Sequence, residues 1–210
     1  MRNVGEDGRC GDDLESVVDA LALKDVRRTG WELRGVREPE SVAAHAWGTA
    51  YLCLVFGARA GVDVGRAVAL AIVHDLAEAE TGDIPTRADP EHQSVDRETK
   101  HELEARAIDS LAGSLDPIVL EYWEEYEARE TPEARFVKDM DLLDTCLQAL
   151  VYERGDRYPE GENRHFDAYD HLDEFFATAE PRLSTSIGRR LFADVHERYE
   201  RARDGREDDR

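Results

Sequence analysis

Lysine is scarce in this chain of 210 residues: only Lys24, Lys100 and Lys138 stand among its 27 basic residues, and the others are arginine. Acidic residues number 48, which gives a formal net charge of −21. An acidic chain with little lysine is typical of halophilic proteins, in which salt screens the self-repulsion of the folded state. An ordinary acidic protein is the alternative interpretation. The negative charge disfavours nucleic acids and anionic membranes as partners, because both bind through cationic side chains.

Cysteine and long apolar runs are also scarce. Cys10, Cys53 and Cys146 are odd in number and widely spaced, which excludes a disulfide framework and gives no zinc-knuckle spacing. No uninterrupted apolar run reaches the roughly 18 residues of a membrane span, and no apolar segment follows the first basic residue as in a signal peptide. The sequence therefore predicts a soluble cytoplasmic protein.

The alternating β-branched pattern of strands is missing, whereas apolar residues recur at helical spacing almost throughout. We expect an all-α fold of about six or seven helices, forming a single domain over residues 13–202 between mobile charged tails at 1–12 and 203–210. Ser41 and Thr131 are predicted helix N-caps, and Pro132 suits the first turn of the helix after Thr131. Helices are predicted from Ser41 to about Phe56, from about Gly65 to Gly82, from Thr131 through Leu150, near 167–178 and near 184–202.

Ionisable side chains interrupt three of these apolar helices. His74 and Asp75 follow the apolar run AVALAIV, His45 lies in SVAAHAWGTA, and Asp141 is flanked by Met140 and leucines. Buried histidine and carboxylate groups need compensation, and a divalent cation compensates both. Two histidines and two carboxylates suit manganese, cobalt, iron, nickel or zinc better than calcium.

These residues also have purely structural interpretations. His45 is then a hydrogen-bonded core histidine, His74 and Asp75 form a surface dipeptide, and Asp141 pairs with Lys138 at a spacing of i, i+3. The coincidence of all four on three apolar helices favours the metal site, because the chain otherwise keeps its charges outside.

Three segments carry a resemblance to a known family: RRTGWELRGVREPESVAAH at 27–45, HDLAEAETGDIP at 74–85 and ARFVKDMD at 134–141. They resemble the HD-domain metal-dependent phosphohydrolases, specifically the 5′-deoxynucleotidase branch, over about residues 14–155. The resemblance implies removal of the 5′-phosphate from deoxyribonucleoside monophosphates and a homodimer. It also implies one divalent metal cation, such as Mn²⁺, Co²⁺ or Mg²⁺, held by His45, His74, Asp75 and Asp141. Bacterial members tend to have arginine directly before the tryptophan, whereas here Gly30 precedes Trp31.

Phosphomonoester hydrolysis needs an activated water, neutralisation of phosphoryl charge and a proton for the leaving oxygen. Glu78 lies four residues after His74, on the same face of the predicted helix, and is our candidate general acid/base. Asp83, in the turn after that helix, is predicted to orient water or the leaving group. The structural alternatives are a surface glutamate and a plain turn aspartate.

Substrate recognition is predicted where the chain is locally basic. Residues 24–37 hold five basic side chains against two acidic ones, and they surround a tryptophan. A guanidinium for the phosphate beside an indole for stacking suits a nucleotide, although the same residues could serve as a core anchor and surface ion pairs. The predicted substrate contacts are Arg28, Trp31, Arg34, Pro85 and Thr86.

Two rival functions stay open at this point. One is an HD hydrolase for a phosphodiester or a guanosine polyphosphate, and the other is a nucleotide sensor that holds metal without turnover. The intact HD pair and the presence of Glu78 disfavour the sensor.

Overall fold

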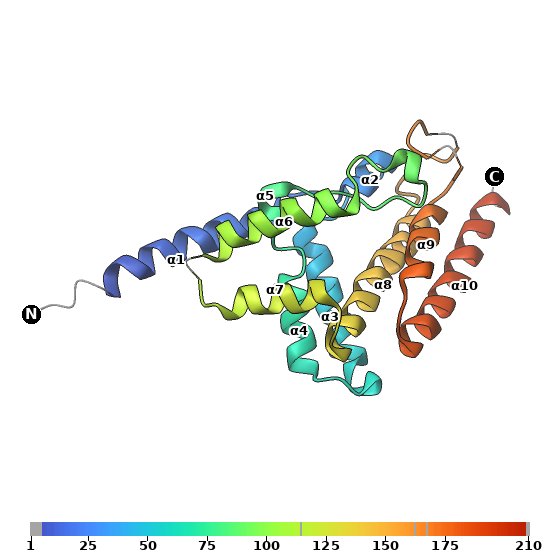
Figure 1. The fold of residues 1–210 in the computed structure, drawn as a ribbon. Helices are drawn as coiled ribbons and strands as arrows, with labels where there is room; N and C mark the ends of the chain where they lie inside the picture. Colours follow the sequence, from blue (N-terminus) through green and yellow to red (C-terminus); the bar gives the residue numbers. More distant parts are fainter. Residues whose placement is uncertain (1–5, 114, 162, 167, 209–210) are drawn as a thin grey trace, which may run out of the picture.

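A computed structural model describes residues 6–113, 115–161, 163–166 and 168–208, with side chains from residue 13 to residue 205. Its elements, in chain order, are α1 (Glu6–Ala20), the 3₁₀ turn η1 (Leu21–Lys24), α2 (Thr29–Arg34), α3 (Val42–Ala60), α4 (Val64–Val73), α5 (Glu78–Thr81), η2 (Pro90–His92), α6 (Arg97–Ala112), α7 (Ile118–Ala128), α8 (Pro132–Arg154), α9 (Asp173–Ala179), η3 (Glu180–Arg182) and α10 (Ser186–Asp208) (Figure 1).

The all-α prediction is confirmed. Seven helices of ten residues or more lie within the described ranges, and the β-type pairing found there is one isolated bridge between Arg27 and Ser41. Among the described residues, none of the helices combines the length and the hydropathy of a membrane-spanning segment.

Helix α8 is the centre of the fold. It packs against α3, α4 and α7 on one side and α9 and α10 on the other, and Figure 1 shows it between these groups. Its apolar side chains, among them Val137, Met140 and Cys146, are fully buried. Burial of these apolar side chains stabilises the packing of α3 against α8. This packing brings together the residues of the candidate site.

The two predicted caps begin the helices that carry the site. The Ser41 hydroxyl accepts a hydrogen bond from the Ala44 amide at 3.2 Å, and Thr131 Oγ1 accepts one from the Ala134 amide at 3.1 Å. Pro132 occupies the first turn of α8, where its missing N–H costs nothing. Both helix starts were predicted correctly because the capping chemistry is local.

Several predicted boundaries were wrong. The helix expected from Gly65 to Gly82 is two helices, α4 and α5, separated by a turn at 74–77. Gly57 lies inside α3, which instead ends at Gly61, where φ is +76°. The helix expected near 167–178 is the shorter α9, and α6 and α7 form in a stretch for which we assigned no helix.

The expected terminal segments are largely helical. Helix α1 begins at Glu6, so most of segment 1–12 belongs to it, and α10 continues to Asp208. Arg203, placed outside the domain by our prediction, donates to Asp173 Oδ1 on α9 at 2.7 Å. This ion pair ties the end of α10 to the domain. Residues 1–5 and 209–210 of the predicted tails lie outside the described residues.

Candidate metal centre and nucleotide pocket

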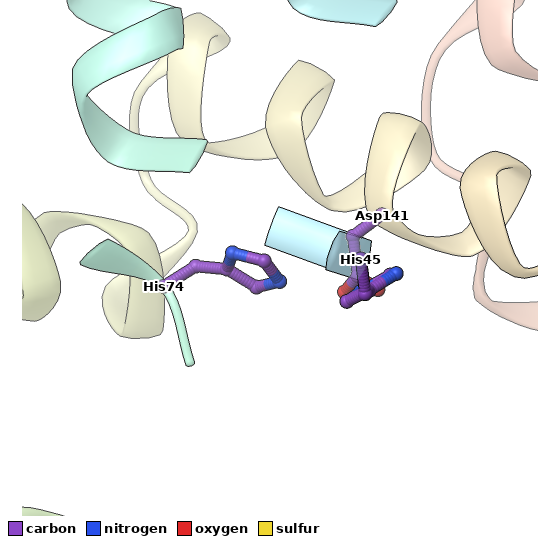
Figure 2. Close-up of side chains that lie close together, drawn as sticks. All are labelled: His45, His74 and Asp141. Carbon is purple, nitrogen blue, oxygen red and sulfur yellow. The ribbon is translucent and has the colours of Figure 1, made fainter. Parts of the chain in front are cut away.

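Three of the four predicted metal ligands converge from three elements. His45 comes from α3, His74 caps the end of α4, and Asp141 comes from α8. A nitrogen or oxygen of each lies within 4.8 Å of those of the other two, and Figure 2 shows the His74 ring directed toward the other pair. His45 Nε2 is 3.1 Å from Asp141 Oδ1. All three residues are buried, so the sequence prediction that they meet in the interior agrees with the geometry.

Asp75 joins this group because α4 ends early. Helix α4 stops at Val73, and residues 74–77 form a turn in which the Leu76 amide donates to Val73 O. The turn leaves Asp75 Oδ2 3.1 Å from His74 Nε2 and 3.7 Å from His45 Nε2. Adjacent residues of a regular helix diverge by about 100°, so the break in the helix is what lets both members of the pair face one point.

The His74 imidazole presents an unpaired nitrogen to the candidate metal site. Its Nδ1 donates to the Ala71 carbonyl at 2.8 Å, which fixes the ring and leaves Nε2 as an acceptor. Nε2 is buried and makes no hydrogen bond with any described residue, although Asp75 Oδ2 is near. An unpaired buried lone pair beside two carboxylates fits a transition-metal ion.

The charges of the group agree with this interpretation. Burial raises the pKa of Asp141, but Lys138, His45 and His74 outweigh it and hold that pKa well below the usual value. Burial lowers the pKa of His45, whereas its hydrogen bonds to Asp141 and Asp144 raise it to about 10. The carboxylates of the group thus favour positive charge on their neighbours, which is also what a bound cation would supply.

Glu78 lines the same pocket but reaches it differently from our prediction. It is the first residue of α5, after the 74–77 turn, so the shared helix face with His74 was wrong. Its side chain is buried, and Oε2 has no hydrogen-bond partner among the described residues. Burial, followed by the charges of Asp75 and Asp83, raises the pKa of Glu78 well above its usual value. A carboxyl group with a raised pKa, buried beside a cluster of candidate ligands, suits a role as general acid or base.

Arg28 and Asp83 form an ion pair at the same pocket. Arg28 lies 3.6 Å from Asp75 and 3.7 Å from Asp83, and Asp83 Oδ2 accepts a hydrogen bond from the Thr29 amide at 2.6 Å. Burial lowers the pKa of Arg28, but the charges of Asp83 and Asp75 outweigh burial and raise this pKa above its usual value. The guanidinium therefore stays charged. Asp83 therefore anchors the start of α2 and keeps Arg28 at the pocket.

One pocket collects most of the predicted site. Its lining includes Arg28, Trp31, Asp75, Glu78, Asp83, Pro85, Thr86 and Asp141 from our prediction, together with Lys100, Lys138, Thr145, Phe175, Thr178 and Arg182, which sequence reasoning missed. Two of the chain's three lysines are thus retained here. Most basic residues of this chain are arginine, so the few lysines stand out in the sequence. Their scarcity is the feature from which a role for Lys100 and Lys138 could have been predicted.

Trp31 and Arg34 have mainly structural surroundings. Trp31 is 1% exposed, packs on Tyr152 and Phe175, and donates from Nε1 to Glu40 at 3.1 Å, so little of it is accessible from the pocket that it lines. Arg34 is not among the described residues that line the pocket. It donates to the backbone carbonyls of His171, Pro159 and Asp170. Arg34 therefore fixes the backbone at Pro159, Asp170 and His171 through these hydrogen bonds, and it does not line the pocket where we predicted a substrate contact.

Comparison with known proteins assigns the class. Residues 20–182 match a family model described as HD domain, and the chain belongs to this family of metal-dependent phosphohydrolases. Within it, the chain is 40% identical to 5′-deoxynucleotidase HDDC2 of Homo sapiens over 153 residues, which is 70% of either chain. It is 36% identical to 5′-deoxynucleotidase hdd1 of Schizosaccharomyces pombe over 146 residues, covering 65% of this chain and 71% of that one.

A solved structure agrees with the fold. A conserved hypothetical protein from Pyrococcus furiosus superposes with a TM-score of 0.67 at 32% identity, and the alignment covers 88% of this chain and 98% of that one. The likeness therefore extends over nearly the whole domain, including helices that follow the HD motifs.

Proposed function

We propose that this protein removes the 5′-phosphate from deoxyribonucleoside monophosphates. The observation that carries the proposal is that two candidate metal ligands, Asp75 and Asp141, line one pocket with a buried Glu78 and four cationic side chains. The unpaired His74 Nε2 lies 3.1 Å from Oδ2 of Asp75, one of the two ligands at this pocket. The similarity to two curated 5′-deoxynucleotidases supports the substrate class.

The residues that would hold the metal are His45, His74, Asp75 and Asp141. This mixed nitrogen and oxygen donor set favours a transition metal such as Mn²⁺ or Co²⁺, and it also admits Mg²⁺. A divalent cation bound there supplies positive charge to the phosphoryl oxygens and makes a nearby water molecule more acidic.

The remaining chemistry belongs to side chains of this chain. Arg28, Lys100, Lys138 and Arg182 line the pocket and would bind the phosphate oxygens through charge-assisted hydrogen bonds. Glu78, whose pKa is raised by burial, would donate a proton to the 5′-oxygen as the ester bond breaks, and then accept a proton from the attacking water. Asp83 would hold Arg28 in place through their ion pair.

The less polar side chains of the pocket lining would receive the nucleoside. Phe175, Pro85 and Thr86 belong to this lining, and Trp31, itself only 1% exposed, packs against Phe175 with the ring centroids 3.9 Å apart. Aromatic and apolar side chains stack on a base with little regard to its identity. We therefore expect discrimination by sugar and phosphate position rather than by base.

The test is phosphate release at molar salt from a panel of 5′-dNMPs, 5′-NMPs, 3′-dNMPs, dNTPs, cyclic nucleotides and guanosine polyphosphates. Each compound is measured with Mn²⁺, Co²⁺, Mg²⁺ or a chelator. We expect metal-dependent hydrolysis with a preference for 5′-dNMPs. Hydrolysis of cyclic or polyphosphate nucleotides alone would assign the rival phosphohydrolase function. If folded, metal-loaded protein releases phosphate from none of these compounds, the result would support a nucleotide sensor.

We further propose a homodimer that buries the exposed face of α3. Trp47, Tyr51, Leu54 and Val55 are all exposed, and the rings of Trp47 and Tyr51 stack with centroids 5.4 Å apart. Their spacing places them along one side of the helix. A self-complementary contact across a two-fold axis would cover this stripe without bringing the acidic surfaces of two copies into the interface core.

The Trp47→Asp variant is expected to be monomeric, because two carboxylates would meet at the centre of the contact. Light scattering after size exclusion at molar salt measures the mass. The matched control is Val18→Asp, which places the same charge on the exposed apolar face of α1 and should leave the dimer intact. A monomeric wild type, or dissociation caused only by the control, contradicts this interface.

Adaptation to high salt also stays a proposal, supported by the net charge of −21 and the scarcity of lysine. The cytoplasmic location stays a prediction. Salt screens the repulsion between the many carboxylates of the folded chain. For this reason the assays above are performed at molar salt.

A further inference from the structure

Asp144 contacts the far side of the His45 ring. His45 Nε2 faces Asp141 at 3.1 Å, and Nδ1 faces Asp144 Oδ2 at 2.7 Å. The His45 side chain is completely buried, so both nitrogens depend on these protein partners. An ionised carboxylate only accepts hydrogen bonds. Asp144 therefore keeps a proton on Nδ1, and a neutral His45 then presents its lone pair from Nε2 toward Asp75 and Asp141.

A glycine makes room for this carboxylate. Gly48 lies three residues after His45 on α3, and it is buried against α8. A Cβ on Gly48 would lie 2.0 Å from Asp144 Oδ1 and 2.7 Å from Asp144 Cγ, closer than atoms approach. Glycine within a helix costs about 1 kcal/mol relative to alanine. The close approach of Asp144 gives a physical reason for glycine at this position.

The two histidines of the site are held differently. His74 donates from Nδ1 to a backbone carbonyl, Ala71 O, at 2.8 Å, whereas His45 is held by a carboxylate. A carboxylate partner fixes the tautomer and also increases the electron density of the ring more than a neutral carbonyl does. Of the two rings, His45 is therefore the one whose affinity for a cation depends on a single side chain outside the ligand set.

We propose that Asp144, seated in the space left by Gly48, is a positioning residue that orients His45 as a metal ligand. This inference rests on the proposed function, because it requires a cation at His45, His74, Asp75 and Asp141. Asp144 is outside that ligand set, and its role is exerted through His45.

Two substitutions test the proposal from opposite sides. Asp144→Asn keeps the size of the side chain but allows its amide to donate to Nδ1, which favours the tautomer that blocks Nε2. Gly48→Ala leaves the charge unchanged and displaces the carboxylate. Each is expected to weaken Zn²⁺ binding by about 10- to 100-fold, measured by competition with a chromogenic chelator. Circular dichroism and thermal unfolding of the metal-free proteins verify that each variant folds.

The controls make the same chemical changes elsewhere. Gly65→Ala adds a methyl group that meets only Asp63 Oδ1 at an ordinary 3.4 Å. Asp109→Asn removes a carboxylate from the exposed side of α6. Both should bind Zn²⁺ as tightly as the wild type.

A spectroscopic readout separates positioning from general stability. In the Zn²⁺-loaded wild type, proton and nitrogen-15 NMR should show the His45 Nδ1–H resonance shifted by its charge-assisted hydrogen bond to Asp144, and Asp144→Asn should lose this shift. Unchanged Zn²⁺ affinity and an unchanged ring spectrum in Asp144→Asn would overturn the proposal. A wild type that binds no Zn²⁺, Mn²⁺ or Co²⁺ would instead overturn the proposed function, so the two failures are distinguishable.

Discussion

The Glu78→Ala variant is expected to lose about 10³-fold in kcat on a 5′-dNMP, within the range of about 10² to 10⁴ that a general acid or base contributes. Metal content should stay at the wild-type value, because Glu78 lies outside the ligand set of His45, His74, Asp75 and Asp141. The physical reason is the buried position of its carboxyl group, where Oε2 has no hydrogen-bond partner among the described residues and the charges around it raise its pKa. A proton held there is available to the leaving oxygen.

The measurement pairs steady-state phosphate release with elemental analysis of the same protein sample. Glu80→Ala is the matched control, because Glu80 lies on the same short helix α5 with its side chain exposed to solvent. It should retain nearly full activity. Near wild-type turnover in Glu78→Ala would remove the general acid/base role, and loss of metal together with activity would make Glu78 part of the ligand system instead.

The pH dependence of kcat supplies an independent sign for this role. A raised pKa means that Glu78 is protonated below that pKa and ionised above it. If its proton is the one donated to the leaving group, kcat should fall as pH rises through the pKa of Glu78 in the substrate complex. Glu78→Gln should abolish this limb of the profile along with most of the activity, since an amide does not exchange the proton.

The local features of this fold were predictable from the sequence because their causes are local. Ser41 and Thr131 cap their helices through hydrogen bonds from backbone amides three residues further along the chain, and such caps are recognisable in the sequence. His45 and Asp141 were found because a charge within an apolar helix requires compensation wherever it is buried. The break after Val73 was missed, since AVALAIVHDLAEAE keeps helical periodicity across the turn and only packing in three dimensions shows it.

Contacts between distant segments could not be obtained in the same way. Arg34 was expected at the substrate because it belongs to a basic segment. Its guanidinium instead donates hydrogen bonds to backbone carbonyls of residues more than 120 positions further along the chain. Arg182 and Lys138 reach the pocket from η3 and α8, and no spacing within one segment shows that they meet. Asp144 is similarly invisible until α3 and α8 are packed, because its partners His45 and Gly48 belong to the other helix.

Removal of Asp141 is the second substitution with a large expected effect, and its result concerns metal binding rather than chemistry. The Asp141→Asn variant should bind Mn²⁺ or Co²⁺ more than about 100-fold more weakly, beyond the loss typical of residues outside a ligand set. Asp141 Oδ1 faces His45, and Oδ2 accepts hydrogen bonds from Tyr126 at 2.8 Å and from Lys138 at 2.5 Å. Asparagine keeps the volume but removes the charge that balances both the cation and Lys138.

Asp139 offers a control on the same helix that separates metal binding from stability. It is fully buried two residues before Asp141, and its carboxylate accepts hydrogen bonds from the amides of Ser184 at 2.9 Å and Thr185 at 2.8 Å before α10. Asp139→Asn should therefore lower the temperature of unfolding while metal affinity is kept. Asp141→Asn should instead lower the metal affinity, measured by chelator competition and by metal stoichiometry after dialysis. Unchanged stoichiometry in Asp141→Asn would take Asp141 out of the ligand set and leave it as the counter-ion of Lys138, whose burial lowers its pKa to about 8 even with that carboxylate beside it.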